Sequence, residues 1–288
     1  MIEHVVLSGA GPNGLVQVGF IAELMRAGHL KNIKSVYGTS SGAFVNTILA
    51  FNLSMDEYGE YMVGRPWNKW IDLNLNLSEI NSHCGIFKWE IMHDFIRPFL
   101  FAHGIPDSIT LKEAYDQTKV DMHIFATELE SFCLVDLNHK TFPNLQLLKA
   151  ISMSAALFPL FRPVAHEGKN YADGGLRNHF PIDELFAANP GKDTILGLNM
   201  VGVAPTFCST MTSFETFFYV LYRTSVEIAM SDKTHELAKQ CKYYMGHCNS
   251  ASVMESKLWE SFFTTPECRQ NKRAEGTRLG LDFIQTKF

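Results

Sequence analysis

The sequence lacks the cysteine pattern of a metal or redox protein. Its six cysteines are scattered over 288 residues, with no CxxC pair and no His/Cys set at the spacing of a zinc site. The nearest approach to a cluster is Cys241, His247 and Cys248, and ordinary thiols in a reducing compartment explain it better. We therefore expect no bound metal and no cofactor.

Long apolar runs and a basic leader are also missing. No stretch reaches the eighteen uncharged apolar residues of a membrane span, and residues 1–4 lack the basic segment of a secretory signal. The formal net charge of −5 argues against binding of nucleic acid, because phosphate contacts need a basic face. These absences predict a cytoplasmic protein, peripheral at membranes if it meets them, and no particular oligomeric state.

What the chain does contain is a strand and helix pattern suited to an α/β domain. Residues 3–7 are β-rich, and residues 15–27 carry apolar side chains at helical spacing before Gly28, a typical helix end. A second short strand over 34–37 and a helix over 43–51 follow. In such a βαβ unit the loops after both strands lie at the carboxyl edge of a parallel sheet, where α/β proteins bind ligands.

The loop after the second strand has the G-x-S-x-G pattern around Ser40, with Gly38 and Gly42 on either side. A serine hydroxyl becomes a nucleophile when the fold exposes it and a base accepts its proton. A tight strand-to-helix turn provides the exposure, and glycines leave it uncrowded. Since chance supplies the pattern in about one chain in ten of this length, the rest of the sequence has to support it.

The loop after the first strand, residues 9–14, reads Gly-Ala-Gly-Pro-Asn-Gly. A dinucleotide site would need a carboxylate at the end of the next strand, where Thr39 and Ser40 stand, and a P-loop would need a lysine where Leu15 stands. Beside a candidate nucleophile we favour a third interpretation, an oxyanion hole of backbone N–H groups. Its candidate members are Gly9, Ala10, Gly11, Asn13 and Gly14.

No local motif identifies the base for Ser40. Asp173 ends a short extended segment before Gly174 and Gly175, and a plain turn is the ordinary explanation of Asp-Gly. A conventional triad in the order Ser, Asp, His would instead use a later histidine. The candidates for that role are His179, His235 and His247.

Together these segments resemble the patatin-like phospholipase family. The resemblance covers about residues 3–200, and Asn178 and Pro181 fit the residues that usually follow the third motif. It rests on three motifs in the family's order and on the helix and proline turn before the third: residues 7–14, 38–42, 173–175 and 150–164.

The resemblance implies a three-layer α/β/α fold with a mostly parallel central sheet and extra C-terminal helices. Residues 1–200 would form the acyl hydrolase domain, and residues 201–288 a helical part packed on it. It further implies calcium-independent cleavage of phospholipids, lysophospholipids or other acyl lipids by a phospholipase A or lysophospholipase type of reaction. In that reaction Ser40 would attack the ester, Asp173 would accept its proton, and the amides of loop 9–14 would hold the oxyanion.

Two residues depart from the family pattern. Ala10 stands where the family usually has Gly, and Asn13 where it has Arg or Lys. Ala10 keeps its N–H, whereas Asn13 removes a positive charge, so the site is less suited to an anionic head group. We still expect activity. The alternatives are a histidine-dependent α/β-hydrolase esterase and a non-catalytic lipid-binding module of the same fold.

The remaining segments give coarser expectations. Trp67 and Trp70 fall in a segment without a clear period, 52–85, and we expect residues 55–85 to gate an acyl pocket and to touch lipid transiently. A bulky apolar stripe in a long helix over 214–230 is better explained by core packing. Further predicted elements are a helix over 87–101 interrupted at Pro98, strands over 122–126, 134–137 and 194–200, and a helix over 145–157.

Overall fold

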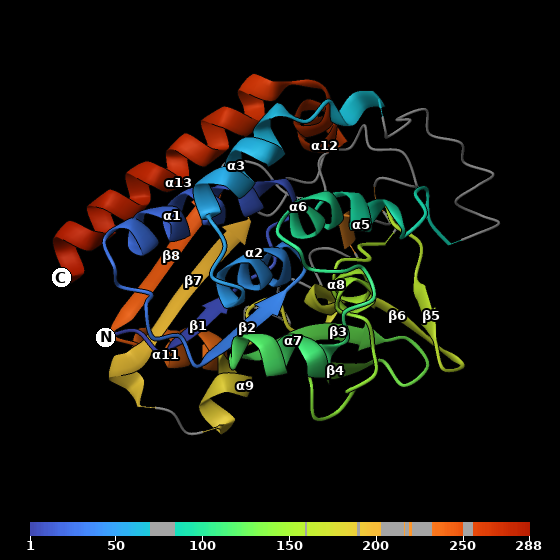
Figure 1. Cartoon of the computed structure of the whole chain (residues 1–288), viewed down its shortest axis with the longest axis horizontal. Helices are drawn as coiled ribbons and strands as arrows, with labels where there is room; N and C mark the ends of the chain where they lie inside the picture. The colour runs from blue at the N-terminus through green and yellow to red at the C-terminus, as the bar shows by residue number, and fades with distance from the viewer. Residues whose placement is uncertain are drawn as a thin grey trace.

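A computed structural model gives the structure of the protein and describes residues 1–69, 84–158, 160–188, 191–202, 216, 219–220, 232–249 and 256–288. Helices lie on both faces of one central sheet (Figure 1). The first two strands are separated by a helix and run parallel, as the βαβ prediction requires. The predicted α/β architecture, a sheet between layers of helices, is confirmed.

Eight strands form the sheet within the described residues, in the order β5-β6-β3-β2-β1-β7-β8, with β4 also paired to β3. The block from β3 to β8 is parallel, whereas β4 and β6 run antiparallel to β3 and β5 runs antiparallel to β6. The strands are β1 (His4–Leu7), β2 (Ser35–Thr39), β3 (Asp121–Glu128), β4 (Cys133–Leu137), β5 (Val164–His166), β6 (Lys169–Asp173), β7 (Ile195–Gly202) and β8 (Tyr243–Asn249).

Side chains alternate between the two faces of the strands, which creates two apolar layers. Val5 and Leu7 belong to the larger cluster with α1 (Gly14–Arg26) and α2 (Ser41–Ala50), and Val6 belongs to a smaller cluster beneath α9 (Ile182–Ala187) and α11 (Asp232–Lys239). The other helices are α3 (Met55–Gly64), α5 (Ile91–Asp94), α6 (Arg97–Ala102), α7 (Leu111–Thr118), α8 (Leu147–Ser154), α12 (Ser256–Thr264), α13 (Pro266–Lys287) and the 3₁₀ turns η1 (Gly11–Asn13), η2 (Trp67–Lys69), η3 (Gly174–Leu176) and η4 (Lys192–Thr194).

The long helix α13 lies along α1 and next to α3 (Figure 1). Glycines on both helices permit this close approach: a Cβ on Gly276 would lie 2.0 Å from the carbonyl oxygen of Val16, and a Cβ on Gly19 would lie 2.1 Å from that of Arg273. Either substitution would force the two helices apart. The C-terminal helix is therefore fixed against the helix that follows the Gly-rich loop.

Two local predictions before residue 105 are wrong in part. Residues 55–64 form α3, because Ser54 caps it by accepting a hydrogen bond from the Glu57 N–H at 3.2 Å. The expected helix over 87–101 is two short helices, α5 and α6, and Pro98 lies in the first turn of α6, where no N–H is needed. The predicted strands in 122–137 and 194–200 and the helix in 145–157 are confirmed within a few residues.

The C-terminal residues add more than helices, since β8 extends the parallel sheet beyond β7. The stripe predicted over 214–230 falls almost wholly outside the described residues, and so does Trp70. Trp67 is buried in the core, stacked on Phe95 with ring centroids 4.7 Å apart. Among the described residues no helix combines the length and apolarity needed to cross a membrane.

Candidate active site

Ser40 sits at a strained turn between β2 and α2. Its backbone has φ 54° and ψ −121°, a conformation that costs free energy for any residue with a side chain. The flanking glycines are required by space: a Cβ on Gly38 would lie 2.8 Å from the Ala43 nitrogen, and one on Gly42 would lie 2.5 Å from the Leu7 carbonyl oxygen. The sharp turn lifts Ser40 out of the sheet.

A second serine, Ser154, anchors this turn. The Ser40 N–H donates to Ser154 Oγ at 2.9 Å, and the Ser154 hydroxyl donates to the carbonyl oxygen of Phe125 in β3 at 2.6 Å. Ser154 is fully buried at the end of α8. Sequence reasoning gave it no role, although a serine at the buried end of a helix needs a polar partner.

Asp173 lies next to Ser40 although 133 residues separate them. It ends β6, which pairs with β3, and a Cβ on the following Gly174 would lie 2.3 Å from the Phe125 carbonyl oxygen. Asp173 is 4% exposed and its carboxylate accepts the Gly175 N–H at 2.7 Å, and the Ser40 side chain lies close enough to lower the pKa of this carboxylate. Close packing of Gly174 on β3 is what brings the carboxylate to the serine.

The electrostatic state of Asp173 is unusual. Burial raises its pKa to about 6, and the hydrogen bonds from Ser40 and Gly175 only partly offset this effect. Among the described residues no Lys, Arg or His lies within ion-pair distance of the carboxylate. The carboxylate is consequently more basic than an ordinary aspartate, as proton transfer from a hydroxyl requires.

The Gly-rich loop offers fewer amides than the sequence suggests. The N–H of Gly9 donates to the His179 carbonyl oxygen at 2.9 Å, and those of Asn13 and Gly14 donate to the carbonyl oxygens of Ala10 and Gly11. In the part of the chain that the structure describes, the N–H groups of Ala10 and Gly11 have no recorded partner. Of the five amides predicted to hold an oxyanion, those of Gly9, Asn13 and Gly14 are thus bonded within the fold.

The conformation of this loop depends on Gly11, whose φ is +51°. A left-handed backbone at this position is cheap for glycine and strained for other residues. Ala10 has φ −155°, so it does not need the left-handed backbone that favours glycine. The structure therefore tolerates the alanine that departs from the family pattern and retains its N–H.

An apolar pocket opens beside Ser40. It encloses about 80 Å³, with Ser40, Ser41 and Gly11 among its polar lining and apolar side chains around the rest. Its apolar lining comes from α1, α2, α3, α12 and the segment around α5, and includes Phe44, Tyr58, Met62, Phe95, Trp259 and Phe262. Helix α3, the N-terminal part of the segment 55–85, lines this pocket through Tyr58 and Met62.

The histidines named as triad candidates lie in different places. His179 is a neighbour of the site: its Nε2 bonds the Met200 carbonyl oxygen at 3.0 Å, and a Cβ on Gly9 would lie 3.3 Å from its Nδ1. Burial lowers the pKa of His179. His247 in β8 bonds Glu275 in α13 at 2.9 Å. The side chain of His235 lies outside the described residues.

Comparison with known proteins agrees with the fold and with the motifs. A family model described as patatin-like phospholipase matches residues 5–186, and the chain belongs to this family. A probable lipid hydrolase, 463L of Invertebrate iridescent virus 6, is 25% identical over 182 residues, which are 62% of this chain and 61% of the relative. The uncharacterized protein R571 of Acanthamoeba polyphaga mimivirus is 26% identical over 184 residues, 63% of this chain and 60% of the relative.

Solved structures show the same fold at low sequence identity. VipD from Legionella pneumophila aligns with a TM-score of 0.56 at 16% identity, over 99% of this chain and 67% of VipD. ExoU in its complex with SpcU from Pseudomonas aeruginosa aligns with a TM-score of 0.50 at 15% identity, over 99% of this chain and 52% of that chain. The chain spans about 60% of the length of its curated viral relatives.

Proposed function

We propose that this protein hydrolyses fatty-acyl esters of phospholipids or lysophospholipids through an acyl-enzyme on Ser40, with Asp173 as the base. The observation that carries the proposal is the position of the buried Asp173 carboxylate close to the Ser40 side chain, which lowers its pKa, with no Lys, Arg or His of the described residues within ion-pair distance. The same serine borders an apolar pocket suited to an acyl chain. The family and the name of the iridovirus relative support a lipid as the substrate.

The reaction follows from these positions. Ser40 Oγ attacks the ester carbonyl carbon as its proton passes to Asp173, and the oxygen that gains negative charge is stabilised by the N–H groups of Ala10 and Gly11. The protonated Asp173 then gives its proton to the departing alcohol. In the second half, water attacks the acyl-enzyme while Asp173 takes a proton from it. The bond between the acyl carbon and Ser40 Oγ then breaks, Asp173 returns the proton to Ser40 Oγ, and the fatty acid leaves.

Each charge in this scheme is handled by a side chain or an amide of the chain itself. We therefore propose that hydrolysis needs no calcium and continues in the presence of EGTA. The substrate would reach the pocket from a membrane surface by transient contact, with the protein in the cytoplasm. A requirement for added calcium would contradict this part of the proposal.

A fluorophosphonate probe tests the nucleophile. We expect rapid covalent labelling of the wild type at Ser40, loss of labelling in Ser40→Ala, and full labelling in the matched variant Ser41→Ala. Fatty acid released from a panel of phospholipids, lysophospholipids and triacylglycerols then identifies the substrate class. Absence of labelling in the folded wild type would instead favour the non-catalytic lipid-binding module.

A second candidate, a histidine-dependent esterase, is favoured by one observation, the position of His179 next to Gly9. In a triad, His179→Gln would abolish hydrolysis as completely as Asp173→Asn. With Asp173 as the base, we expect His179→Gln to keep most of the activity, because glutamine can still donate to the Met200 carbonyl oxygen. The ratio of the two losses separates the mechanisms.

A further inference from the structure

Asn13 stands at the N-cap position of α1 but does not cap the helix. Asparagine at this position usually accepts a hydrogen bond from a backbone N–H of the first turn, and here no such bond forms. Asn13 Oδ1 instead accepts a hydrogen bond from Lys272 Nζ of α13 at 2.5 Å. Asn13 is 2% exposed, and its buried Nδ2 has no hydrogen-bond partner among the described residues. The Asn13 side chain thus bonds to α13 and makes no capping hydrogen bond to α1.

Lys272 is equally poorly compensated. No carboxylate of the described residues lies within ion-pair distance of its ammonium group, whereas Arg273, the next residue, pairs with Asp56 at 3.0 Å. The ammonium contacts the amino end of α1, where the helix dipole already places positive charge. Burial lowers the pKa of Lys272. Cys268 and Glu275 on the same helix oppose this lowering only in part, so stability alone gives little reason for a lysine at this place.

The contact is connected directly to the two amides of the Gly-rich loop. The Asn13 N–H donates to the Ala10 carbonyl oxygen at 3.0 Å, which closes the turn that contains Gly11. Helix α13 is itself fixed, because Gly276 and Gly280 leave no room between it and α1. Lys272 therefore ties a rigid helix to the end of the loop whose other end presents the N–H groups of Ala10 and Gly11.

We propose that Lys272 is a positioning residue for the oxyanion loop: it holds Asn13, and its charge favours an anion at the amides of Ala10 and Gly11. The inference rests on the proposed reaction at Ser40. Helix α13 lies outside residues 5–186, which match the family model. Through Lys272 it supplies a positive charge next to the loop, where Asn13 supplies none. The effect falls on the charged transition state and leaves substrate binding nearly unchanged.

Three variants of α13 test this inference on a neutral short-chain ester. Lys272→Met removes the charge and the bond, and we expect kcat to fall about tenfold with KM within about twofold. Lys272→Arg keeps the charge and is expected to retain kcat within about threefold. Arg278→Met, an exposed site on the same helix, is the matched control with unchanged kinetics. Thermal unfolding of each variant checks folding, and Lys272→Gln replaces Lys272→Met if the latter does not fold.

A charge-relocation variant sharpens the test. Asn13→Lys combined with Lys272→Met returns a cation to the loop, and we expect it to recover most of the lost kcat. Equal losses in Lys272→Arg and Lys272→Met would overturn the role of the charge. A rise in KM confined to anionic phospholipids, with kcat unchanged, would make Lys272 a head-group contact and overturn the positioning role.

The rate of fluorophosphonate labelling at Ser40 separates this inference from the proposed function. If the wild type is labelled at Ser40 and hydrolyses esters, while the Lys272→Met variant has the same kcat, only the inference about Lys272 fails. If wild-type Ser40 is not labelled, the proposed function fails first. We expect labelling of Lys272→Met to slow about tenfold, in step with kcat, because phosphonylation also builds negative charge at the loop.

Discussion

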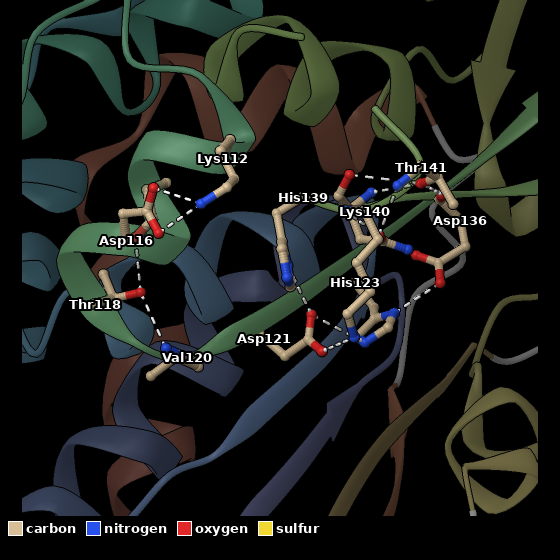
Figure 2. A network of polar contacts seen from close by, with 12 residues as sticks. Lys112, Asp116, Thr118, Val120, Asp121, His123, Asp136, His139, Lys140 and Thr141 are labelled. Carbon is tan, nitrogen blue, oxygen red and sulfur yellow. Dashed lines mark hydrogen bonds and ion pairs between the residues drawn. The ribbon is translucent and has the colours of Figure 1, made fainter. Parts of the chain in front are cut away.

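The two ends of strand β3 carry two polar regions that handle charge in opposite ways. At the carboxyl end, Ala126 pairs with Asp173, the carboxylate beside Ser40. At the amino end, His123 lies between two carboxylates, with Nδ1 2.7 Å from Asp136 Oδ2 and Nε2 3.4 Å from Asp121 Oδ1 (Figure 2). We call the second region, Asp121, His123, Asp136, His139 and Lys140, the β3 charge network.

The charge network compensates its carboxylates, and the site does not. Lys140 and His123 hold the pKa of Asp121 well below its usual range, while the two carboxylates raise the pKa of His123 to about 9. Burial raises the pKa of Asp173 to about 6, and no cation of the described residues lies within ion-pair distance to oppose this effect. A compensated cluster stabilises the fold, whereas an uncompensated buried carboxylate destabilises it and is typical of a site selected for reactivity.

Replacing one carboxylate in each region should therefore give opposite results, and this is the largest effect we expect. Asp173→Asn should lower kcat/KM by about 10³-fold, because the amide cannot accept the Ser40 proton. It should also stabilise the protein at pH 8 by up to about 3 kcal/mol, since ionised Asp173 has a folded pKa about two units above its unfolded value. Ester hydrolysis and urea unfolding measure the two effects.

The matched variant at the other end is Asp121→Asn. It should leave kcat/KM within about threefold and should destabilise the fold by about 2 kcal/mol, because His123 and Lys140 lose their partner. The comparison between the regions breaks down if Asp121→Asn reduces activity as much as Asp173→Asn, or if Asp173→Asn destabilises the protein at pH 8.

The contrast also explains what the sequence could predict. Motifs in which glycine is sterically required are local and readable, so the strand-to-helix turn at Ser40 was predictable from Gly38 and Gly42. The partner of Ser40 was not predictable from local pattern, because β6 meets β3 only in the folded sheet. The family resemblance named Asp173 in advance, but its burial and its raised pKa depend on packing that no motif records.

Other features were hidden because their signals are not periodic. Strand β8 completes the sheet from residue 243, far from its neighbour β7 in sequence, and α13 is defined by small residues such as Gly276 that weaken an apolar stripe. The amides of Ala10 and Gly11, which have no partner among the described residues, could not be told from that of Gly9, since the bond from Gly9 to the His179 carbonyl oxygen is a long-range contact. Lys272 contacts Asn13 across 259 residues.

Ser154 links the nucleophile to strand β3, since it accepts a hydrogen bond from the Ser40 N–H and donates one to the Phe125 carbonyl oxygen. Ser154→Ala should lower kcat by on the order of tenfold with little change in KM, because the strained Ser40 backbone loses its anchor. The matched control is Ser152→Ala, also buried on α8, whose hydroxyl donates to the Leu148 carbonyl oxygen at 2.9 Å. Equal kinetic losses in both variants would point to a general effect of packing in α8.

The pKa of Asp173 predicts the acid limb of the activity. Because the ionised carboxylate accepts the proton, kcat/KM for a neutral ester should fall about tenfold per pH unit below about pH 6. The limb should persist in His179→Gln, whose imidazole is gone. Its disappearance in that variant would transfer the titration to His179 and support the triad.

The last prediction concerns stability and the charge network alone. The folded pKa of His123, about 9, lies above its unfolded value of about 6.5, so its contribution to stability is complete below pH 6.5 and is lost as the pH rises through 9. The free energy of unfolding should decrease by up to about 3 kcal/mol over this window, and urea midpoints at pH 6, 8 and 10 measure it.

Burial raises the pKa of Tyr37, which stacks on His123, so the tyrosine stays neutral and does not obscure the change. His123→Gln should flatten the profile, and a profile that stays steep in this variant would place the titrating group outside the network.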